Sequence, residues 1–555
     1  MKKILFILFT IHCSLFAFAQ PGWVKKASKS VFTLKTFDES GALIASSNGF
    51  FVGASGEAVS SFVPFKGAAR AIVIDAQDKQ MEVTGMLGAN EMYDVAKFRV
   101  AGKTQPLTVA AGIAPTGSTA WLLPYRETKK VPSGTVRKAE TFHEGDYAYY
   151  TIAMQASEMT VSCPLLNDDG EVIGIVQPSA SSNDSLSYAV SARFADSLKV
   201  NGLSLNDPTL RQTRIPVELP DNINDANLMV YMASGNTDSA TYVKLVDEFI
   251  RKFPKSADGY TYRAQFAAAH ADFAEADSYI QQAMKVAENK DEVQFSYARM
   301  IYNKNIYQTS IPYDAWTFDK ALEATREASR LNPSPSYRQL EANILYASKR
   351  YDEAYDIYTD LAQHSNLSAA EMWFYAASCK AQQKDTLARM ALLDSAVNTF
   401  TKPYLKEAAP YLWSRAEARM DAGMYREAIS DMNDYEQLMA AEVNARFYYI
   451  RHQAEIEGRL FQQALNDIER AITMEPKETV YYAEKASLEV RVGRYDEAIA
   501  TAKECISIAP DNSDGYLFLG LAQCLKGNKK EGVTNLQKAR ELGDPQAEGL
   551  IEKYK

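Results

Sequence analysis

The sequence predicts a multidomain protein in which an all-β barrel or sandwich is followed by an all-α helical array. Between residues 20 and 201, short apolar runs such as 30–34 and 71–74 alternate with turn residues, a pattern typical of many-stranded antiparallel folds. After Asn224 the apolar residues recur with a period near 3.6, and a longer period appears toward the C-terminal end. A chain of 555 residues is also too long for one hydrophobic core.

Composition excludes some function classes. The apolar fraction of 46% and the charged fraction of 23% are those of ordinary globular protein. With a net charge of −10, the chain has no global positive field to attract phosphate, so nucleic acid is not expected as the main partner. The sequence has no C-x-x-C, no H-E-x-x-H and no glycine-rich phosphate loop. We therefore expect neither a metal nor a cofactor.

The first residues have the features of a secretory signal peptide over residues 1–19. Lys2 and Lys3 precede an apolar run over 4–18, and Ala17-Phe18-Ala19 offers an A-x-A cleavage site. The run is short for a membrane span, and no later stretch is apolar enough to cross a bilayer. We expect a mature chain that begins at Gln20 and is periplasmic, associated with the outer membrane, or extracellular.

The four cysteines of the mature chain are too scattered to form a disulfide framework. They are Cys163, Cys379, Cys505 and Cys524. Cys505 and Cys524 would come close if their helices pack side by side. The interpretation that we favour is that all four are buried and unpaired.

The stretch over residues 159–175 decides the expected chemistry. It reads M-T-V-S-C-P-L-L-N-D-D-G-E-V-I-G-I, and its second half places a turn between two apolar strands. It resembles the nucleophile segment of HtrA-like, chymotrypsin-fold serine proteases, G-N-S-G-G-P-L-L-N-x-x-G-x-V-I-G-I. With Pro164 as the anchor, the nucleophilic serine corresponds to Val161. The glycines of the family correspond to Met159, Ser162 and Cys163.

Further pieces resemble the same family, in the order of its histidine, aspartate and serine sites. They are N-G-F-F-V at 48–52 with G-E-A-V-S at 56–60, K-G-A at 66–68, Y-D-V-A at 93–96 and S-Y-A-V-S at 187–191. The resemblance implies a chymotrypsin-like double barrel over residues 20–201. Residues 202–223, with Pro208, Pro216 and Pro220, are predicted to form a semi-rigid connector.

By this resemblance, the catalytic triad is degenerate. The histidine position corresponds to Val63, the aspartate to Asp94 and the serine to Val161, and valine can neither attack a carbonyl nor accept a proton. Ser162 lies one residue along, so its side chain should point away from the site, and it lacks an activating base. His143 lies in a turn and is interpreted as a solvated loop residue. We expect a pseudoprotease with no catalytic residue.

The 34-residue period resembles tetratricopeptide (TPR) repeats. Ala498 lies 34 residues after Ala464 and 34 before Gly532 (498 − 464; 532 − 498), and small residues at such positions let paired helices approach closely. The resemblance implies about nine helix pairs over residues 224–555, stacked into a superhelix with a concave groove. The residues expected to contact a partner in this groove are Arg446, Tyr449, Gln453, Glu489 and Arg491.

These patterns favour an exported, non-catalytic scaffold or adaptor of the bacterial cell envelope. It would bind partner proteins through the TPR groove and also through the degenerate protease cleft. One alternative is an active trypsin-like serine endopeptidase whose repeats recruit substrate. Another is a periplasmic holdase chaperone, which binds unfolded chains without a fixed partner.

Overall fold

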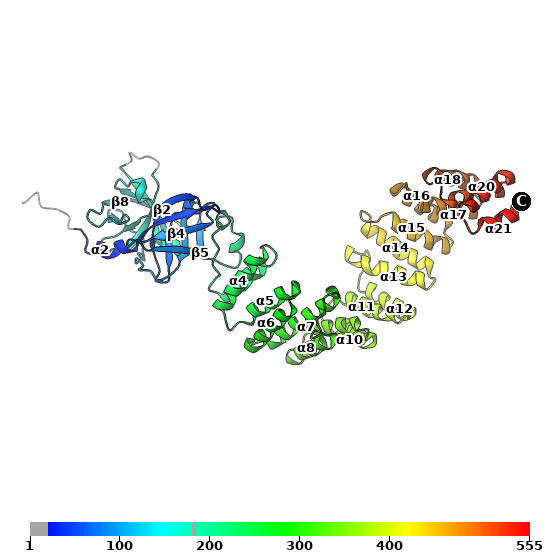
Figure 1. Ribbon diagram of the computed structural model, residues 1–555, viewed down its shortest axis with the longest axis horizontal. Coiled ribbons are helices and arrows are strands. Elements are labelled where there is room, and N and C mark those ends of the chain that lie inside the picture. The colour runs from blue at the N-terminus through cyan, green and yellow to red at the C-terminus, as the bar shows by residue number, and fades with distance from the viewer. Residues whose placement is uncertain (1–19, 180–184) are drawn as a thin grey trace, which may run out of the picture. The chain divides into compact units, whose positions relative to one another are not determined.

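The first part of the structure is a closed, six-stranded antiparallel barrel (Figure 1). The computed structural model describes residues 20–179 and 185–555. In barrel order the strands are β1 (Val31–Phe37), β2 (Leu43–Phe51), β3 (Glu57–Ser60), β6 (Val95–Val100), β5 (Gln80–Asn90) and β4 (Arg70–Ile74). Alternate residues of β1 point inward, so that Phe32 and Leu34 are buried beside Phe98 in the barrel core.

A second six-stranded antiparallel barrel follows. In barrel order its strands are β10 (Pro164–Leu166), β11 (Val172–Gln177), β12 (Ser187–Ser191), β9 (Tyr147–Ala153), β8 (Ser133–Phe142) and β7 (Thr119–Leu122). The predicted hairpin joins β10 to β11, and Gly170 has φ +79° in its turn. Trp23, which precedes the short helix α2 (Val24–Ala27), covers this turn and donates its indole N–H to the carbonyl of Asp168 at 2.9 Å.

Much of the segment over 202–223 packs along the first barrel. The N–H of Met86 in β5 donates to the carbonyl of Pro216 at 2.8 Å, and the N–H of Glu218 donates to the carbonyl of Met86 at 3.0 Å. Leu210 and Ile215 are buried in the core of that barrel. The segment contains two short 3-10 helices, η6 (Ser204–Asn206) and η7 (Leu210–Gln212), and is docked on the barrel by backbone hydrogen bonds and apolar burial.

Consecutive helices occupy the rest of the chain (Figure 1). They are α3 (Ile223–Ala233), α4 (Ser239–Lys252), α5 (Ala257–Ala269), α6 (Phe273–Val286), α7 (Lys290–Tyr307), α8 (Phe318–Leu331), α9 (Pro335–Ala347), α10 (Tyr351–His364), α11 (Ala369–Gln382), α12 (Thr386–Val397), α13 (Ala409–Asp421), α14 (Tyr425–Met439), α15 (Ala445–Glu457), α16 (Phe461–Met474), α17 (Thr479–Arg491), α18 (Tyr495–Ile508), α19 (Ser513–Lys526), α20 (Lys529–Glu541) and α21 (Ala547–Tyr554). Within the described residues, α3 to α20 make nine successive pairs in sequence.

Small residues set the close approach of paired helices. Ala464 and Ala498 are fully buried. A Cβ added to Gly520 of α19 would lie 2.8 Å from the carbonyl oxygen of Gly532 in α20, and one added to Gly532 would lie 2.4 Å from the sulfur of Cys524. Side chains at these glycines would force the two helices apart.

The chain divides into two units, the first ending at Phe266 and the second formed by Ala267–Lys555. Cys163, Cys379, Cys505 and Cys524 are all buried and free of disulfides. In the part of the chain that the structure describes, no helix is both long and apolar enough to cross a bilayer, and no group of acidic, histidine or cysteine side chains is arranged to hold a metal ion. The expected signal peptide at 1–19 lies outside the described residues and stays a prediction.

Candidate functional site

A cleft of about 750 Å³ is lined by residues of both barrels. Its walls include Val63, Asp94 and Val161, so the three positions that correspond to the triad come together as the resemblance implies. Two of the lining residues expose apolar side chains to solvent: Val63 is 56% exposed and Met159 is 86% exposed.

The carboxylate of Asp94 is used to hold a backbone turn. Its Oδ1 accepts hydrogen bonds from the N–H groups of Phe62 and Val63, both at 2.8 Å. These groups begin the short 3-10 helix η2 (Val63–Phe65), whose first N–H groups have no partner inside the helix. Asp94 thus caps the turn that presents the Val63 side chain, and no imidazole lies between the carboxylate and the cleft among the residues that line it.

Ser162 does not line the cleft: its side chain is buried behind the cleft wall, where it contacts two serines that do line the cleft, Ser47 and Ser61. It is fully buried, and its backbone has φ +65°. Its hydroxyl lies 2.6 Å from the hydroxyl of Ser61 and 3.2 Å from that of Ser47, and it accepts the N–H of Ser61 at 3.2 Å. The expected direction of the Ser162 side chain is confirmed. The cluster of three hydroxyls was not predicted, because Ser162 is more than 100 residues away in the chain from both Ser47 and Ser61.

The backbone around Val161 makes its hydrogen bonds internally. The N–H of Thr160 donates to the carbonyl of Ser157 at 2.9 Å, and the N–H of Val161 donates to that of Glu158 at 3.3 Å. These bonds form the 3-10 helix η4 (Glu158–Thr160). An oxyanion hole needs backbone N–H groups that point free into the cleft, and the N–H of Val161 is already engaged.

Asn48 fixes the position of this segment. Its side-chain amide in β2 donates to the carbonyl of Met159 at 2.8 Å and to the carbonyl of Val161 at 3.1 Å. Two carbonyl groups are thereby held toward the first barrel. The bonds connect the two barrels directly at the cleft.

His143 does not take part in the cleft. It is exposed in the short 3-10 helix η3 (His143–Gly145), where its ring lies 5.7 Å from that of Tyr147. The described residues that line the cleft do not include it. Its interpretation as a solvated loop residue is confirmed.

The residues predicted to contact a partner in the groove differ in exposure. Arg446, Gln453 and Arg491 are exposed, and Tyr449 is half-buried against Tyr481 at a ring distance of 5.4 Å. The prediction for Glu489 is wrong, because only 2% of this residue is exposed. It lies one helical turn after Ala486, which packs on α18, and so shares the buried face of α17.

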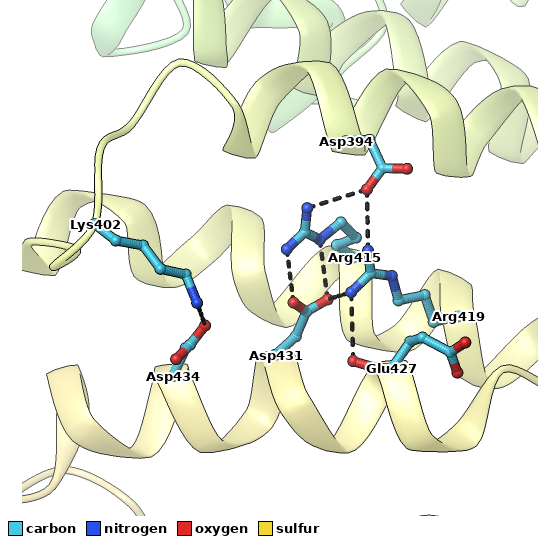
Figure 2. Close-up of polar contacts among 7 residues, drawn as sticks. All are labelled: Asp394, Lys402, Arg415, Arg419, Glu427, Asp431 and Asp434. Carbon is cyan, nitrogen blue, oxygen red and sulfur yellow. Dashed lines mark hydrogen bonds and ion pairs between the residues drawn. The ribbon is translucent and has the colours of Figure 1, made fainter.

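A network of buried ion pairs inside the second unit was not predicted. Arg415 and Arg419 of α13 both contact Asp431 of α14 and Asp394 of α12, at distances from 2.7 to 3.1 Å (Figure 2). Asp431 is 2% exposed. One signal in the sequence could have indicated these pairs. Arg415 and Asp431 are each followed 36 residues later by a residue of the same type, Arg451 and Asp467 (451 − 415; 467 − 431).

The recurrence is a second ion pair of the same kind. Arg451 of α15 contacts Asp467 of α16 through Nε at 2.6 Å, and its Nη2 donates to the other carboxylate oxygen at 3.1 Å. Arg451 also contacts Glu436 at 2.6 Å. Because removal of one member leaves the other charge buried without a partner, these pairs tie each helix to the next.

Comparison with known proteins finds relatives that match only a short part of the chain. No protein-family model matches the chain. It is 30% identical over 95 residues to small glutamine-rich tetratricopeptide repeat-containing protein 2 of Saccharomyces cerevisiae, over 17% of this chain and 28% of that protein. It is 30% identical over 90 residues to the Hsp70-Hsp90 organizing protein of Triticum aestivum, over 16% of this chain and 15% of that protein. The chain thus spans less than a third of the length of these relatives.

Among solved structures, the chain is similar to the active form of the Rv3671c protease of M. tuberculosis. The two are 20% identical over 36% of this chain and 90% of that chain, with a TM-score of 0.28. An inactive mutant of the same protease is 21% identical over 32% of this chain and 93% of that chain, with a TM-score of 0.27.

The predicted fold class is confirmed. The two closed barrels and the helical region are those of a trypsin-like double barrel followed by a TPR-type helical array.

Proposed function

We propose that this protein is an exported adaptor of the bacterial cell envelope, which binds partner proteins through its helical array and does not cleave peptide bonds. The observation that carries the proposal is the direction of Ser162. Its hydroxyl is buried behind Ser61 and does not line the cleft, where Val63 and Val161 occupy the positions of the base and the nucleophile.

The chemistry of acyl transfer supports this proposal. Such a reaction needs a nucleophile, a base to take its proton and donors to stabilise the oxyanion. The described cleft-lining residues include serine and threonine hydroxyls but no histidine. An unassisted hydroxyl is a poor nucleophile at neutral pH, and the N–H of Val161 is engaged by Glu158. The cleft hydroxyls therefore have no base to activate them, and the N–H at the position of the nucleophile is not free to stabilise an oxyanion.

The adaptor role rests on the helical array. Arrays of this type present a surface rather than a reaction centre. One relative is named as an organizer of Hsp70 and Hsp90, which favours binding of proteins for this chain too. Export rests on the sequence of residues 1–19, and N-terminal sequencing of protein isolated from its native host should begin at Gln20.

Activity-based labelling tests the absence of catalysis. A fluorophosphonate probe and fluorescent casein are added to the full mature chain, with an active trypsin-like protease as the positive control. We expect no labelled serine in residues 20–201 and no casein turnover. The variant Ser162→Ala identifies the labelled residue. If the wild-type protein is labelled and this variant is not, Ser162 is a nucleophile.

Capture from a crosslinked envelope fraction tests the adaptor role. An adaptor should return a short list of proteins in fixed ratio to the bait. A broad list of unfolded proteins would instead indicate a holdase.

A further inference from the structure

The cleft between the two barrels carries more carboxylates than cations. Its volume of about 750 Å³ lies inside the range of ligand pockets. Three carboxylates and one ammonium group line it, those of Asp94, Glu127, Glu158 and Lys130. None of the four forms an ion pair with a residue that the structure describes. The charge of the cleft wall is therefore negative.

The ammonium group belongs to the same loop as one of the carboxylates. Oε1 of Glu127 accepts the backbone N–H groups of Lys129 and Lys130, at 2.7 and 3.2 Å. Lys129 does not line the cleft, whereas Lys130 does. When the charge of Lys130 is set against that of its neighbour Glu127, the carboxylates of Asp94 and Glu158 remain. The cleft is thus complementary to a cation.

Both remaining carboxylates have an oxygen left for a group outside the chain. Asp94 uses Oδ1 to accept the N–H groups of Phe62 and Val63, both at 2.8 Å, and its Oδ2 has no partner within the described part of the chain. Glu158 is exposed, and its side chain contacts no donor among the residues that the structure describes. Asp94 belongs to the first barrel and Glu158 precedes β10 of the second, so each barrel contributes one such carboxylate.

An exposed apolar side chain adjoins each of these two carboxylates. Asp94 caps the turn that presents Val63, and Met159 follows Glu158 directly in the chain. Val63 and Met159 both line the cleft and are both largely exposed. A ligand that covers them removes apolar surface from water. The complementary ligand therefore offers an apolar side chain beside its cation.

We propose that the cleft binds, without cleaving it, a segment of a partner protein in which an arginine or lysine lies next to an apolar side chain. The cation pairs with Asp94 and Glu158, and the apolar side chain packs on Val63 and Met159. Arginine suits the site better than lysine, because its planar guanidinium can contact two carboxylates at once. The inference rests on the proposed non-catalytic adaptor function, adds a second binding surface to it and names the chemistry of the bound segment.

Other ligands fit the cleft less well. An acidic segment would find one ammonium group, that of Lys130, against three carboxylates. A small cation without an apolar neighbour would satisfy the carboxylates but would leave Val63 and Met159 in water.

Binding of short peptides to the full mature chain tests the proposal. The probes are N-acetyl-Ala-Leu-Arg-Leu-Ala-amide and three analogues, in which citrulline replaces arginine, glutamate replaces arginine, or serine replaces both leucines. Citrulline keeps the shape of arginine without its charge. Dissociation constants are measured by saturation-transfer NMR. We expect the arginine peptide to bind roughly three- to tenfold more tightly than the citrulline peptide, the range for one or two partly exposed ion pairs. The serine analogue should bind more weakly than the arginine peptide, and the glutamate analogue should bind most weakly.

Variants that remove one charge at a time locate the site. Glu158→Gln should reduce the preference for arginine over citrulline roughly twofold or more, and its combination with Asp94→Asn should abolish the preference. The matched control is Glu144→Gln, because Glu144 is an exposed residue of the same barrel that does not line the cleft. It should leave the preference unchanged.

Three results would overturn the proposal. They are equal binding of the arginine and citrulline peptides, an unchanged preference in the double variant, and binding of ethylguanidinium as tight as that of the arginine peptide. Failure of the proposed function is a different result, because mass spectrometry would then show that the arginine peptide is cut during incubation. If the peptide stays intact and binds without a preference for arginine, the non-catalytic function stands and the cleft assignment is wrong.

Discussion

The hydroxyl of Ser162 lies 2.6 Å from the hydroxyl of Ser61, and both side chains are buried at the junction of the two barrels. The residue next to Val161 therefore contributes its oxygen to contacts with two serines of the cleft wall, Ser47 and Ser61, and does not itself line the cleft. The positive φ of Ser162 turns the chain in this direction, since it rotates the side chain away from the course of an ordinary strand.

Replacement of Asp94 should loosen the turn at Val63. Asp94→Ala removes the acceptor of two backbone hydrogen bonds at 2.8 Å, and we expect a loss of about 1–3 kcal/mol in stability of the barrel. Hydrogen–deuterium exchange should accelerate at the amides of Phe62 and Val63. Asp94→Asn keeps an acceptor oxygen and tolerates the φ of +48°, so its effect should be smaller. Equal exchange in wild type and Asp94→Ala would contradict the capping role.

Asp431 and Asp434 of α14 should differ strongly when each is replaced by alanine. Asp431→Ala leaves Arg415 and Arg419 with the more exposed Asp394 as their remaining carboxylate partner (Figure 2), and we expect a cost of about 2–3 kcal/mol from the lost charge-assisted hydrogen bonds. Asp434→Ala removes an ion pair with Lys402, whose side chain is 64% exposed, and should cost less than about 1 kcal/mol. Urea unfolding followed by far-ultraviolet circular dichroism measures both. Similar costs would show that the buried network contributes little.

Glu455 should make the helical array less stable as the pH rises. Burial, followed by the negative charge of Asp467, raises the pKa of Glu455 from 4.5 to about 8. Arg451 is 4.0 Å away, but it is engaged by Asp467 at 2.6 Å. In the folded state Glu455 therefore keeps a proton that the unfolded chain releases near pH 4.5. Its contribution to stability is present at low pH and is lost between about pH 5 and pH 8.

A glutamine at position 455 tests this pH dependence. The slope for one such group approaches about 1.4 kcal/mol per pH unit inside the window. Glu455→Gln should flatten the change in urea midpoint between pH 5 and pH 8. Glu457→Gln, on the exposed side of the same helix, should leave the slope as in wild type. An unchanged slope in Glu455→Gln would mean that this carboxyl is not protonated in the folded state.

Replacement of two helical glycines by alanine should change the stability of the protein in opposite directions. Gly520→Ala places a Cβ 2.8 Å from the backbone of Gly532 and from Leu536, and we expect destabilisation of about 1–3 kcal/mol. Gly549 in α21 has open space around it, so Gly549→Ala should stabilise by about 0.5–1 kcal/mol through reduced backbone entropy of the unfolded chain. Differential scanning calorimetry compares the two. Stabilisation by Gly520→Ala would show that α19 and α20 can separate without cost.

The sequence by itself determined the two fold classes and the identity of the side chains at the cleft. Strand alternation follows from the geometry of one strand, and the 34-residue period follows from one pair of adjacent helices, so both are local patterns. The valines at positions 63 and 161 exclude a nucleophile and a base there under any backbone course. Spacing also located the small residues that lie between paired helices, among them Ala464 and Gly532.

Only the tertiary structure decided which distant groups meet. It placed Ser162 on Ser61, docked the segment before α3 on the first barrel, and buried Glu489 on the face of α17 that meets α18. A period shows that one face of a helix is buried, but not which residue of another element supplies a partner for a buried charge. That choice depends on contacts between segments far apart in the chain, as in the pairing of Arg451 with Asp467.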